Sequence, residues 1–456
     1  MYDSFENPSQ RAFIPDTTKQ FAFNFLIPNL DVNFLLSGHG QQALLSRAFH
    51  SYYNTANLVT GQNAYNHIKA NTSDYIFMFK VFTSESGDQE MGVALNTRLE
   101  GRGIVTDESI SFFNGFTNFP QSVYANIFND NYQAQAYHQL SFTYRERVNR
   151  RLSVGFKFSA LAGLYYSQLN ISQSSVIFNK VQDQARVSLG GNYRTNNQTG
   201  ESTFNTIFPI LVNPGASASM GVTYFDERGF KWQGNIKNLG FIRWGSKSRT
   251  NSFVGTALIN NFSSAQRETT IANSIDSLSK HGQSHHSFIT PTNGLLELSI
   301  NRTYWLDEEG KIKFSPTLIG SKEIFYNGFT AALNAPIQLG KHSVALTSTY
   351  DELKLFNLGL QYMQKSENAE FFIGSERLFA TGSFLSAALK NGQGAQTQTK
   401  TPIKPFTGMD FYIGASFKFG PLIERQMNSS GIGPQGDKGF LGKIWDGLFG
   451  KKDPNY

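Results

Sequence analysis

Apolar and polar residues alternate with a period of two along much of the chain. In the segment LSVGFKFSA (152–160), every even-numbered position is apolar, and the odd-numbered positions are Ser, Gly, Lys and Ser. The same pattern recurs in segments 91–100, 140–145, 220–224, 296–301 and 411–419. Alternation of this kind is typical of a β-strand that is apolar on one face only.

The predicted strands are longer than those of most soluble β proteins. Globular strands have a modal length of about 5–6 residues, whereas a tilted strand that crosses a bilayer needs about 9–11 residues with one apolar face. Aromatic residues gather near the predicted strand ends, as in the interfacial girdles of membrane barrels, among them Tyr144, Tyr224, Trp244, Trp305 and Tyr350. The pattern favours a transmembrane β-barrel over a β-sandwich or a soluble barrel.

Sixteen segments carry the strand pattern. They are 21–27, 30–36, 74–82, 90–100, 136–146, 151–166, 182–194, 217–226, 229–238, 294–304, 312–319, 322–331, 341–350, 353–364, 369–379 and 409–419. The first two belong either to the wall or to an N-terminal plug, so we expect an all-β, antiparallel barrel of about 14 strands (roughly 12 to 16). The barrel must close, because an open sheet edge in lipid leaves backbone N–H and C=O groups unpaired.

The connections between the predicted strands differ in length. Short turns rich in Asp, Asn, Gly or charge are expected at 149–152, 225–230, 306–311, 339–342 and 350–353. Long polar segments are expected at 101–135, 195–216, 246–293 and 380–408. Short turns on one side and long loops on the other are typical of bacterial outer-membrane barrels.

Composition excludes several other architectures. Charged residues make up 16% of the 456 residues, aromatic residues make up 14%, and the mean hydropathy is −0.33. A helical membrane protein needs a run of about 20 apolar residues, which this chain lacks. Disordered chains contain few aromatic residues. A net charge of +6 without a long basic run does not fit a nucleic-acid-binding protein.

The cysteine count and the first residues bear on the compartment. The chain contains no cysteine, which excludes disulfides, thiolate metal sites and cysteine nucleophiles. Its opening, MYDSFENPSQ, has neither the charged region nor the apolar region of a signal peptide. We therefore expect the mature form of a protein of the Gram-negative outer membrane, with its signal peptide already removed.

Three parts of the chain are distinguished by their patterns. Residues 71–420 are expected to form the barrel. Residues 1–70 form an N-terminal segment, in which positions 40–54 have helical spacing. This segment is a plug in the lumen, a cap over the periplasmic end, or the first strands. Residues 421–456 are expected to form a flexible linker and a tail.

The tail contains a short amphipathic helix at 439–452, GFLGKIWDGLFGKK. Its apolar stripe consists of Phe440, Leu441, Ile444, Trp445, Leu448 and Phe449. Such a helix lies on a membrane surface or docks in a groove of a partner protein. We expect it to tether the barrel to a partner in a complex.

Five basic residues fall on the polar phase of their strands and are expected to face the lumen. They are Arg98, Arg145, Lys157, Lys237 and Lys418. Together they would make a cationic channel that favours anions or anionic headgroups. Glu100 and Glu297 share this phase, so a lumen filled with paired charges is the other interpretation.

Candidate catalytic and metal sites are weak. The segment HGQSHHSF contains His281, His285 and His286, but no Glu lies between the first two, as a metalloprotease helix requires. A polar loop accounts for them. The chain also lacks a Gly-x-Ser-x-Gly segment. We expect no enzymatic activity, no metal and no cofactor.

Three segments resemble a known family. RRLSVGFKFSALAGLYYS (150–167), FKWQGNIKNLGFIRW (230–244) and FENPSQRAFIP (5–15) are similar to motifs of FadL-like outer-membrane barrels of Bacteroidota, which carry a domain of unknown function. The similarity covers most of residues 1–420. It implies a 14-stranded barrel, allows for an N-terminal plug, and implies no particular ligand.

Two functions are compatible with these features. The one we favour is a non-enzymatic accessory subunit of a larger outer-membrane complex, in secretion or outer-membrane protein assembly, because the tail and the long loops suit partner binding. The alternative, implied by the resemblance, is a channel or transporter for small hydrophobic or amphipathic solutes. The expected partners are outer-membrane lipid and other outer-membrane or periplasmic proteins, and not nucleic acid.

Overall fold

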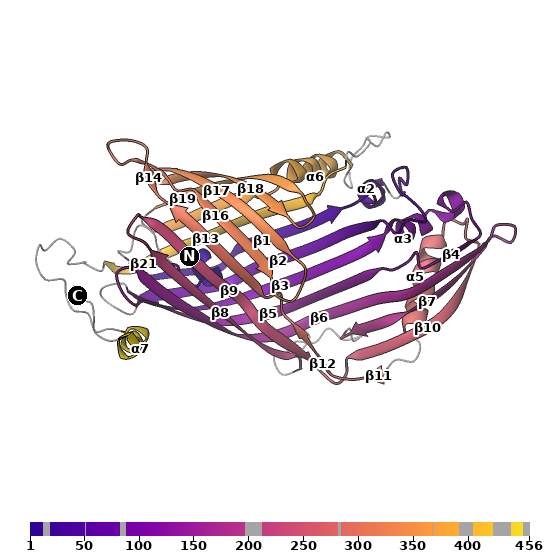
Figure 1. Cartoon of the computed structure of the whole chain (residues 1–456), viewed down its shortest axis with the longest axis horizontal. Helices are drawn as coiled ribbons and strands as arrows, with labels where there is room; N and C mark the ends of the chain where they lie inside the picture. The colour runs from indigo at the N-terminus through magenta and orange to yellow at the C-terminus, as the bar shows by residue number, and fades with distance from the viewer. Residues whose placement is uncertain are drawn as a thin grey trace, which may run out of the picture.

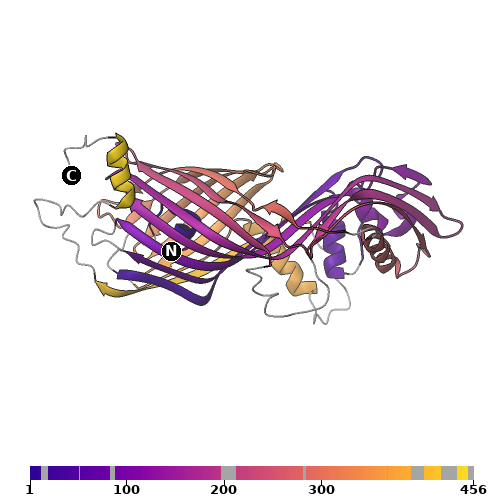
Figure 2. The same ribbon diagram turned by 90° about the horizontal axis from the view of Figure 1, so that it is seen from below.

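A computed structural model of the chain describes residues 1–11, 19–50, 52–82, 88–196, 212–280, 284–366, 368–391, 405–422 and 439–449. Within these residues the protein is a closed β-barrel with an extension that projects beyond one end (Figures 1 and 2). No helix in the described ranges is long and apolar enough to cross a membrane.

Fourteen antiparallel strands form the barrel wall. In order around the ring they are β1 (Lys19–Ser37), β2 (Tyr65–Phe82), β3 (Gln89–Thr106), β5 (Asn131–Arg147), β6 (Leu152–Asn179), β8 (Pro214–Phe225), β9 (Phe230–Trp244), β13 (Leu295–Arg302), β16 (Thr317–Glu323), β17 (Phe329–Leu339), β18 (His342–Asp351), β19 (Phe356–Lys365), β20 (Ala369–Ser375) and β21 (Gly408–Leu422). Each pairs with the next, and β21 pairs back with β1 through partners such as Phe419 and Phe21. The predicted closed barrel of about 14 strands is confirmed.

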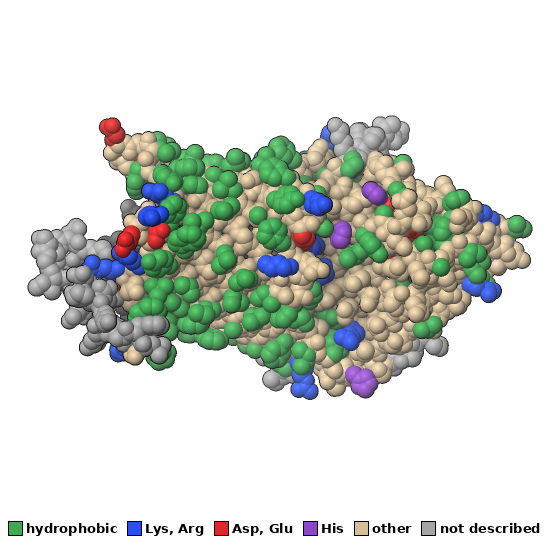
Figure 3. All heavy atoms as spheres, in the orientation of Figure 1, with side chains coloured by type: hydrophobic (Ala, Val, Ile, Leu, Met, Phe, Trp, Pro, Cys, Tyr) green, Lys and Arg blue, Asp and Glu red, His purple; other side chains and the backbone are tan. Residues whose placement is uncertain are grey.

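The outer face of the wall is apolar and the inner face is polar. On the outside, Phe142 of β5 pairs with Phe158 of β6, and both are exposed. One residue further along the same pair, Thr143 lies opposite Lys157, and both are buried inside. On the face shown in Figure 3, hydrophobic side chains are concentrated on the barrel half, and fewer lie on the extension. An apolar outer band on a closed barrel is the architecture of bacterial outer-membrane proteins.

One end of the barrel has short turns and the other has long connections. The turn between β8 and β9 is closed by Asp226, whose Oδ1 accepts the N–H groups of Arg228 and Phe230 at 2.9 and 2.8 Å. Gly229 in this turn has φ +80°, a value that favours glycine. Residues 1–11 and the last described residues, 439–449, lie at this end (Figure 1). In outer-membrane barrels the short turns face the periplasm, which orients the molecule.

The long connections carry most of the remaining elements. These are α2 (Gln41–His50), α3 (Asp107–Phe112), η1 (Gly115–Asn118), β4 (Val123–Ala125), β7 (Gln184–Thr195), β10 (Arg249–Asn260), α5 (Arg267–Lys280), β11 (Ser284–His285), β12 (Phe288–Pro291) and α6 (Leu378–Asn391). At the periplasmic end lie α1 (Asp3–Glu6), β14 (Tyr304–Trp305), β15 (Ile312–Phe314) and α7 (Phe440–Phe449).

The extension has a hydrophobic core separate from the lumen. Strand β6 runs beyond the ring and pairs there with β7 and β4, and β7 pairs with β10. Helices α3 and α5 lie against one face of this sheet (Figure 2). The core consists of buried aliphatic and aromatic side chains, among the latter Phe112, Phe119, Phe178 and Phe262. Burial of this apolar surface supplies the stabilising free energy of the extension.

Several predicted boundaries differ from the observed ones. Segments 21–27 and 30–36 form the single wall strand β1, whose register shifts between Phe25 and Asn29 around Pro28. Proline lacks the N–H needed for a sheet ladder, which explains the interruption. The wall therefore begins at Lys19, and β1 and the first third of β2 fall inside the expected N-terminal segment 1–70.

Other predicted segments have a different place in the fold. Segment 182–194 is β7, which pairs with β6 and β10 and lies outside the ring. Segments 312–319 and 322–331 divide instead into β15, β16 and the start of β17, because the chain turns at 324–328. The long connections, expected to be polar loops, contain α3, α5 and α6. Alternation alone does not distinguish a strand facing lipid from one packed under helices.

Candidate functional site

Residues 1–11 occupy the lumen at the periplasmic end. Phe5, in the single turn of α1, is fully buried. The Lys80 ammonium donates a hydrogen bond to the carbonyl oxygen of Ser4 at 3.1 Å, and Arg145 Nε donates to that of Ser9 at 2.9 Å. The segment is thus held in the lumen by side chains of the wall.

Two glycines of the wall make room for this segment. Gly155 of β6 lies directly opposite Gly221 of β8. A Cβ atom on Gly155 would lie 2.0 Å from the carbonyl oxygen of Pro8, and one on Gly221 would lie 2.4 Å from Asn7 Oδ1. We call this pair the glycine seat. Any larger side chain there would occupy the same space as residues 7 and 8.

Glu6 is the main charged contact of the N-terminal segment. Its Oε1 accepts hydrogen bonds from the Tyr75 hydroxyl at 2.7 Å and from the guanidinium of Arg98. Its backbone carbonyl accepts from Asn235 Nδ2 at 3.0 Å. Strands β2, β3 and β9 therefore converge on one residue. Hydrogen bonds to charged groups are worth more than neutral ones, so Glu6 is central to the seating of the plug.

The structure places all five predicted basic residues inside the barrel. Arg98 pairs with Glu6. The others with carboxylate partners are Arg145 with Glu90 at 3.4 Å, Lys237 with Glu297 at 2.9 Å, and Lys418 with Glu370 at 3.6 Å. Lys157 is 1% exposed, and Glu6 is the main source of its electrostatic attraction. The described lumen therefore contains paired charges rather than an uncompensated cationic surface.

The sequence did not identify the plug contacts as a site. Glu6, Tyr75 and Asn235 lie far apart in the chain and share no motif. One signal in the sequence could have located these contacts. Gly155 and Gly221 fall on the polar, lumen-facing side of otherwise regular strands. Glycine inside a strand often marks a close approach of another backbone, and here that backbone is residues 7–9.

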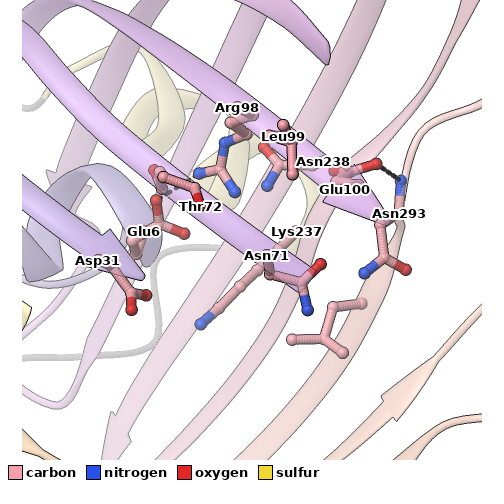
Figure 4. Close-up of a pocket in the computed structure, with 12 residues that line it drawn as sticks. Glu6, Asp31, Asn71, Thr72, Arg98, Leu99, Glu100, Lys237, Asn238 and Asn293 are labelled. Atoms are coloured by element: carbon pink, nitrogen blue, oxygen red, sulfur yellow. Dashed lines mark hydrogen bonds and ion pairs between the residues drawn. The ribbon is translucent and has the colours of Figure 1, made fainter. Parts of the chain in front are cut away.

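A polar cavity of about 180 Å³ lies beyond Glu6, toward the long connections. Figure 4 shows Asp31, Arg98 and Lys237 pointing into it from different strands. Its lining consists of Glu6, Asp31, Asn71, Thr72, Ser73, Arg98, Leu99, Glu100, Lys237, Asn238, Asn293 and Leu295. Glu100 is held by neutral donors, the Tyr137 hydroxyl and Gln135 Nε2, both at 2.7 Å.

The tail helix α7 lies against the periplasmic rim (Figure 2). The buried carboxylate of Glu146, near the end of β5, accepts the N–H groups of Leu441 and Gly442 at 2.8 and 2.7 Å. Phe440, Ile444 and Trp445 are exposed. The side chains of the predicted stripe residues Leu448 and Phe449 lie outside the described set. Whether this stripe contacts lipid or a partner stays a prediction.

We expect Glu146→Gln to release α7 from the rim. The substitution removes the negative charge that caps the first turn, which should cost about 1–2 kcal/mol. The equilibrium for detachment should rise roughly fivefold to thirtyfold, measured as faster tryptic cleavage after Lys443. Glu227→Gln, in the exposed β8–β9 turn, removes an equal charge and should leave that rate unchanged. An equal rate in both variants would contradict the capping role.

The histidines of HGQSHHSF, interpreted above as part of a polar loop, lie only partly within the described residues. Residue 281 lies outside them, and His285 in β11 is exposed and pairs with Arg249 of β10 in the sheet. Within the described ranges, no three His, Asp or Glu side chains are grouped to hold a metal ion.

Comparison with known proteins gives a family and a set of similar barrels. The toluene transporter TodX of P. putida aligns over 91% of this chain and 93% of its own at 8% identity and TM-score 0.39. A Pseudomonas aeruginosa FadL homologue aligns over 91% and 94% at 11% identity and TM-score 0.41. The translocator domain of the Neisseria meningitidis autotransporter NalP aligns over 89% and 90% at 9% identity and TM-score 0.33. The architecture described above rests on the chain's own strand pairings.

Curated proteins and family models complete the comparison. No curated protein matches the chain. One family model, described as a family of unknown function, DUF5723, matches residues 12–376. The matched region runs from just before β1 to the end of β20 and so includes thirteen of the fourteen wall strands, all but β21. The chain belongs to the DUF5723 family.

Proposed function

We propose that this protein is a channel for small solutes in the outer membrane, closed at its periplasmic end by its own residues 1–11. The observation that carries the proposal is the glycine seat, where two wall residues are glycines and so leave space for residues 7 and 8. A barrel that served only as a platform could fill its lumen permanently with side chains of its own wall. It would not need a separate polar segment in the lumen.

The contacts of the plug suit reversible closure. Residues 1–11 contain one helical turn, and most of their contacts with the described wall are hydrogen bonds and ion pairs. A hydrogen bond contributes a net of about 0.5–1.5 kcal/mol, because water replaces it when it breaks. These polar contacts act together with the packing of Tyr2 and Phe5 against Tyr75, and water can replace the polar ones when the plug leaves.

We expect Glu6→Gln to increase the fraction of time for which the channel is open. A neutral amide accepts weaker hydrogen bonds from Tyr75 and Arg98, which should cost about 1–2 kcal/mol of seating free energy. The open fraction in planar bilayers should rise roughly fivefold to thirtyfold.

A matched control is available in the periplasmic turn between β14 and β15. Glu309→Gln changes the same charge on an exposed residue that pairs with the nearby Lys311, and it should conduct like the wild type. If Glu6→Gln and Glu309→Gln both stay closed while the barrel is folded, the lumen is sealed by more than the plug and the channel proposal fails.

A second function, an accessory subunit of an outer-membrane complex, has its own support. The extension presents a folded surface beyond the barrel, and α7 exposes Phe440, Ile444 and Trp445 at the rim. Blue-native electrophoresis of gently solubilised outer membranes tests it. Migration well above the 50.9 kDa chain would support the complex, and migration as the chain alone in detergent would exclude a stable one.

A further inference from the structure

We propose that the cavity beyond Glu6 binds a small polar solute through an ammonium group that is bound by Asp31. The inference rests on the channel function proposed above and specifies what the channel selects. It concerns the chamber on the outer side of the plug, which a solute entering from the long-loop end reaches first.

The strand register places Asp31 in a row of lumen-facing residues. Asp31 of β1 lies opposite Tyr412 of β21 on one side and Ser73 of β2 on the other. Ser73 in turn lies opposite Arg98 of β3. Two strand spacings, about 9–10 Å, therefore separate Asp31 from Arg98. The guanidinium of Arg98 pairs with Glu6 and not with Asp31 in the described structure.

Neither Asp31 nor Glu100 has a cationic partner in the described part of this cavity, but Glu100 is held by neutral donors and the Asp31 carboxylate is not. It makes no hydrogen bond and no ion pair within the described parts of the chain. The charges that act on it most strongly are carboxylates, those of Asp410, Glu376 and Glu6. Asp410 is itself held by Asn33 Nδ2 at 2.9 Å and by the N–H of Glu376. A cation beside Asp31 would relieve this repulsion, so the site favours a positively charged group.

The other lining residues define the rest of the solute. Only Leu99 and Leu295 among the lining residues are apolar, and a hydrocarbon would leave the polar groups there without partners, at a cost of about 1–3 kcal/mol each. The volume of about 180 Å³ suits a solute the size of roughly six waters. Lys237 and Asn71 also face this space (Figure 4). A carboxylate on the far end of the solute would be attracted to Lys237.

Four probes of equal length test the ammonium assignment. Propylamine, β-alanine, propionate and propanol differ only in their end groups, and their binding to the full chain in detergent can be measured by saturation-transfer NMR. We expect propylamine or β-alanine to bind and propionate and propanol not to bind. Tighter binding of propylamine indicates that the solute is a cation, and tighter binding of β-alanine indicates that it is a zwitterion.

Two variants locate the site. Asp31→Asn should weaken binding of the ammonium probes at least tenfold. Asp74→Asn should leave binding unchanged, because residue 74 follows the lumen-facing Ser73 and has the opposite strand phase. Equal binding of propionate and propylamine, or equal affinity in both variants, would overturn the assignment. These measurements need no open channel, so they are independent of the bilayer test of the proposed function.

Discussion

Gly155→Leu should expel residues 1–11 from the lumen and convert a closed barrel into an open one. The first side-chain carbon alone would lie 2.0 Å from the carbonyl oxygen of Pro8, a backbone atom that cannot rotate away. Overpacking of this kind costs about 3 kcal/mol, which corresponds to roughly a hundredfold shift toward the unseated state. We expect a matching increase in the open fraction in planar bilayers, larger than that of Glu6→Gln.

The control for this prediction is a wall glycine without a lumen contact. Gly320 of β16 lies opposite the exposed Leu298, and a Cβ atom there would meet nothing within 4 Å. Gly320→Leu makes the same change in strand propensity and should keep the channel closed. Both variants should retain the heat-dependent gel mobility of a folded barrel, which separates loss of the plug from loss of the fold.

The absence of cysteine makes a direct readout of the plug possible. Ser4 is fully buried in the lumen, so Ser4→Cys gives a single thiol in an otherwise cysteine-free chain. Its reaction with a maleimide should be slow in the wild-type background and fast when combined with Gly155→Leu. If the thiol stays protected while residue 155 is leucine, residues 1–11 are not displaced and the glycine seat does not control them.

The barrel was predictable from sequence because the membrane imposes it. Lipid on one side and a polar lumen on the other require alternation over the whole strand, and residues 152–160 show it without exception. The same alternation misplaced β7, because its Val187 and Leu189 face the core under α3 and α5 instead of lipid. A soluble core and a bilayer both require that one face of a strand be apolar.

The lumen could be predicted only in part, and the reason is physical. Strand phase correctly placed Arg98 and Lys237 inside the barrel. It could not show their partners, because pairing depends on cross-strand register and on the path of residues 1–11. Glu6 lies outside any strand, in one turn of helix, so no periodicity marks it. The apolar stripe of the tail helix could be predicted from its spacing. The capping of this helix by Glu146 could not, because it joins residues 295 positions apart in sequence.

Phe112→Ala should unfold the extension locally and leave the barrel intact. Phe112 of α3 is 4% exposed, and its ring centroid lies 4.7 Å from that of Phe262 and 5.1 Å from that of Phe128. Removing a buried phenylalanine ring costs about 3–5 kcal/mol through lost burial and the remaining cavity. Because this core does not include the lumen, the loss should stay within the extension, which opens as a separate cooperative unit.

Hydrogen exchange measured by mass spectrometry distinguishes this outcome from global unfolding. Amides of β7 and β10 should exchange at least a hundredfold faster in Phe112→Ala, as expected for about 3 kcal/mol, while those of β17 and β18 should not change. Phe158→Ala removes an equal ring from the lipid-facing side of β6 and should leave β7 and β10 protected. Faster exchange throughout the barrel would show that the two parts fold as one unit, and that the extension cannot rearrange on its own when a partner binds.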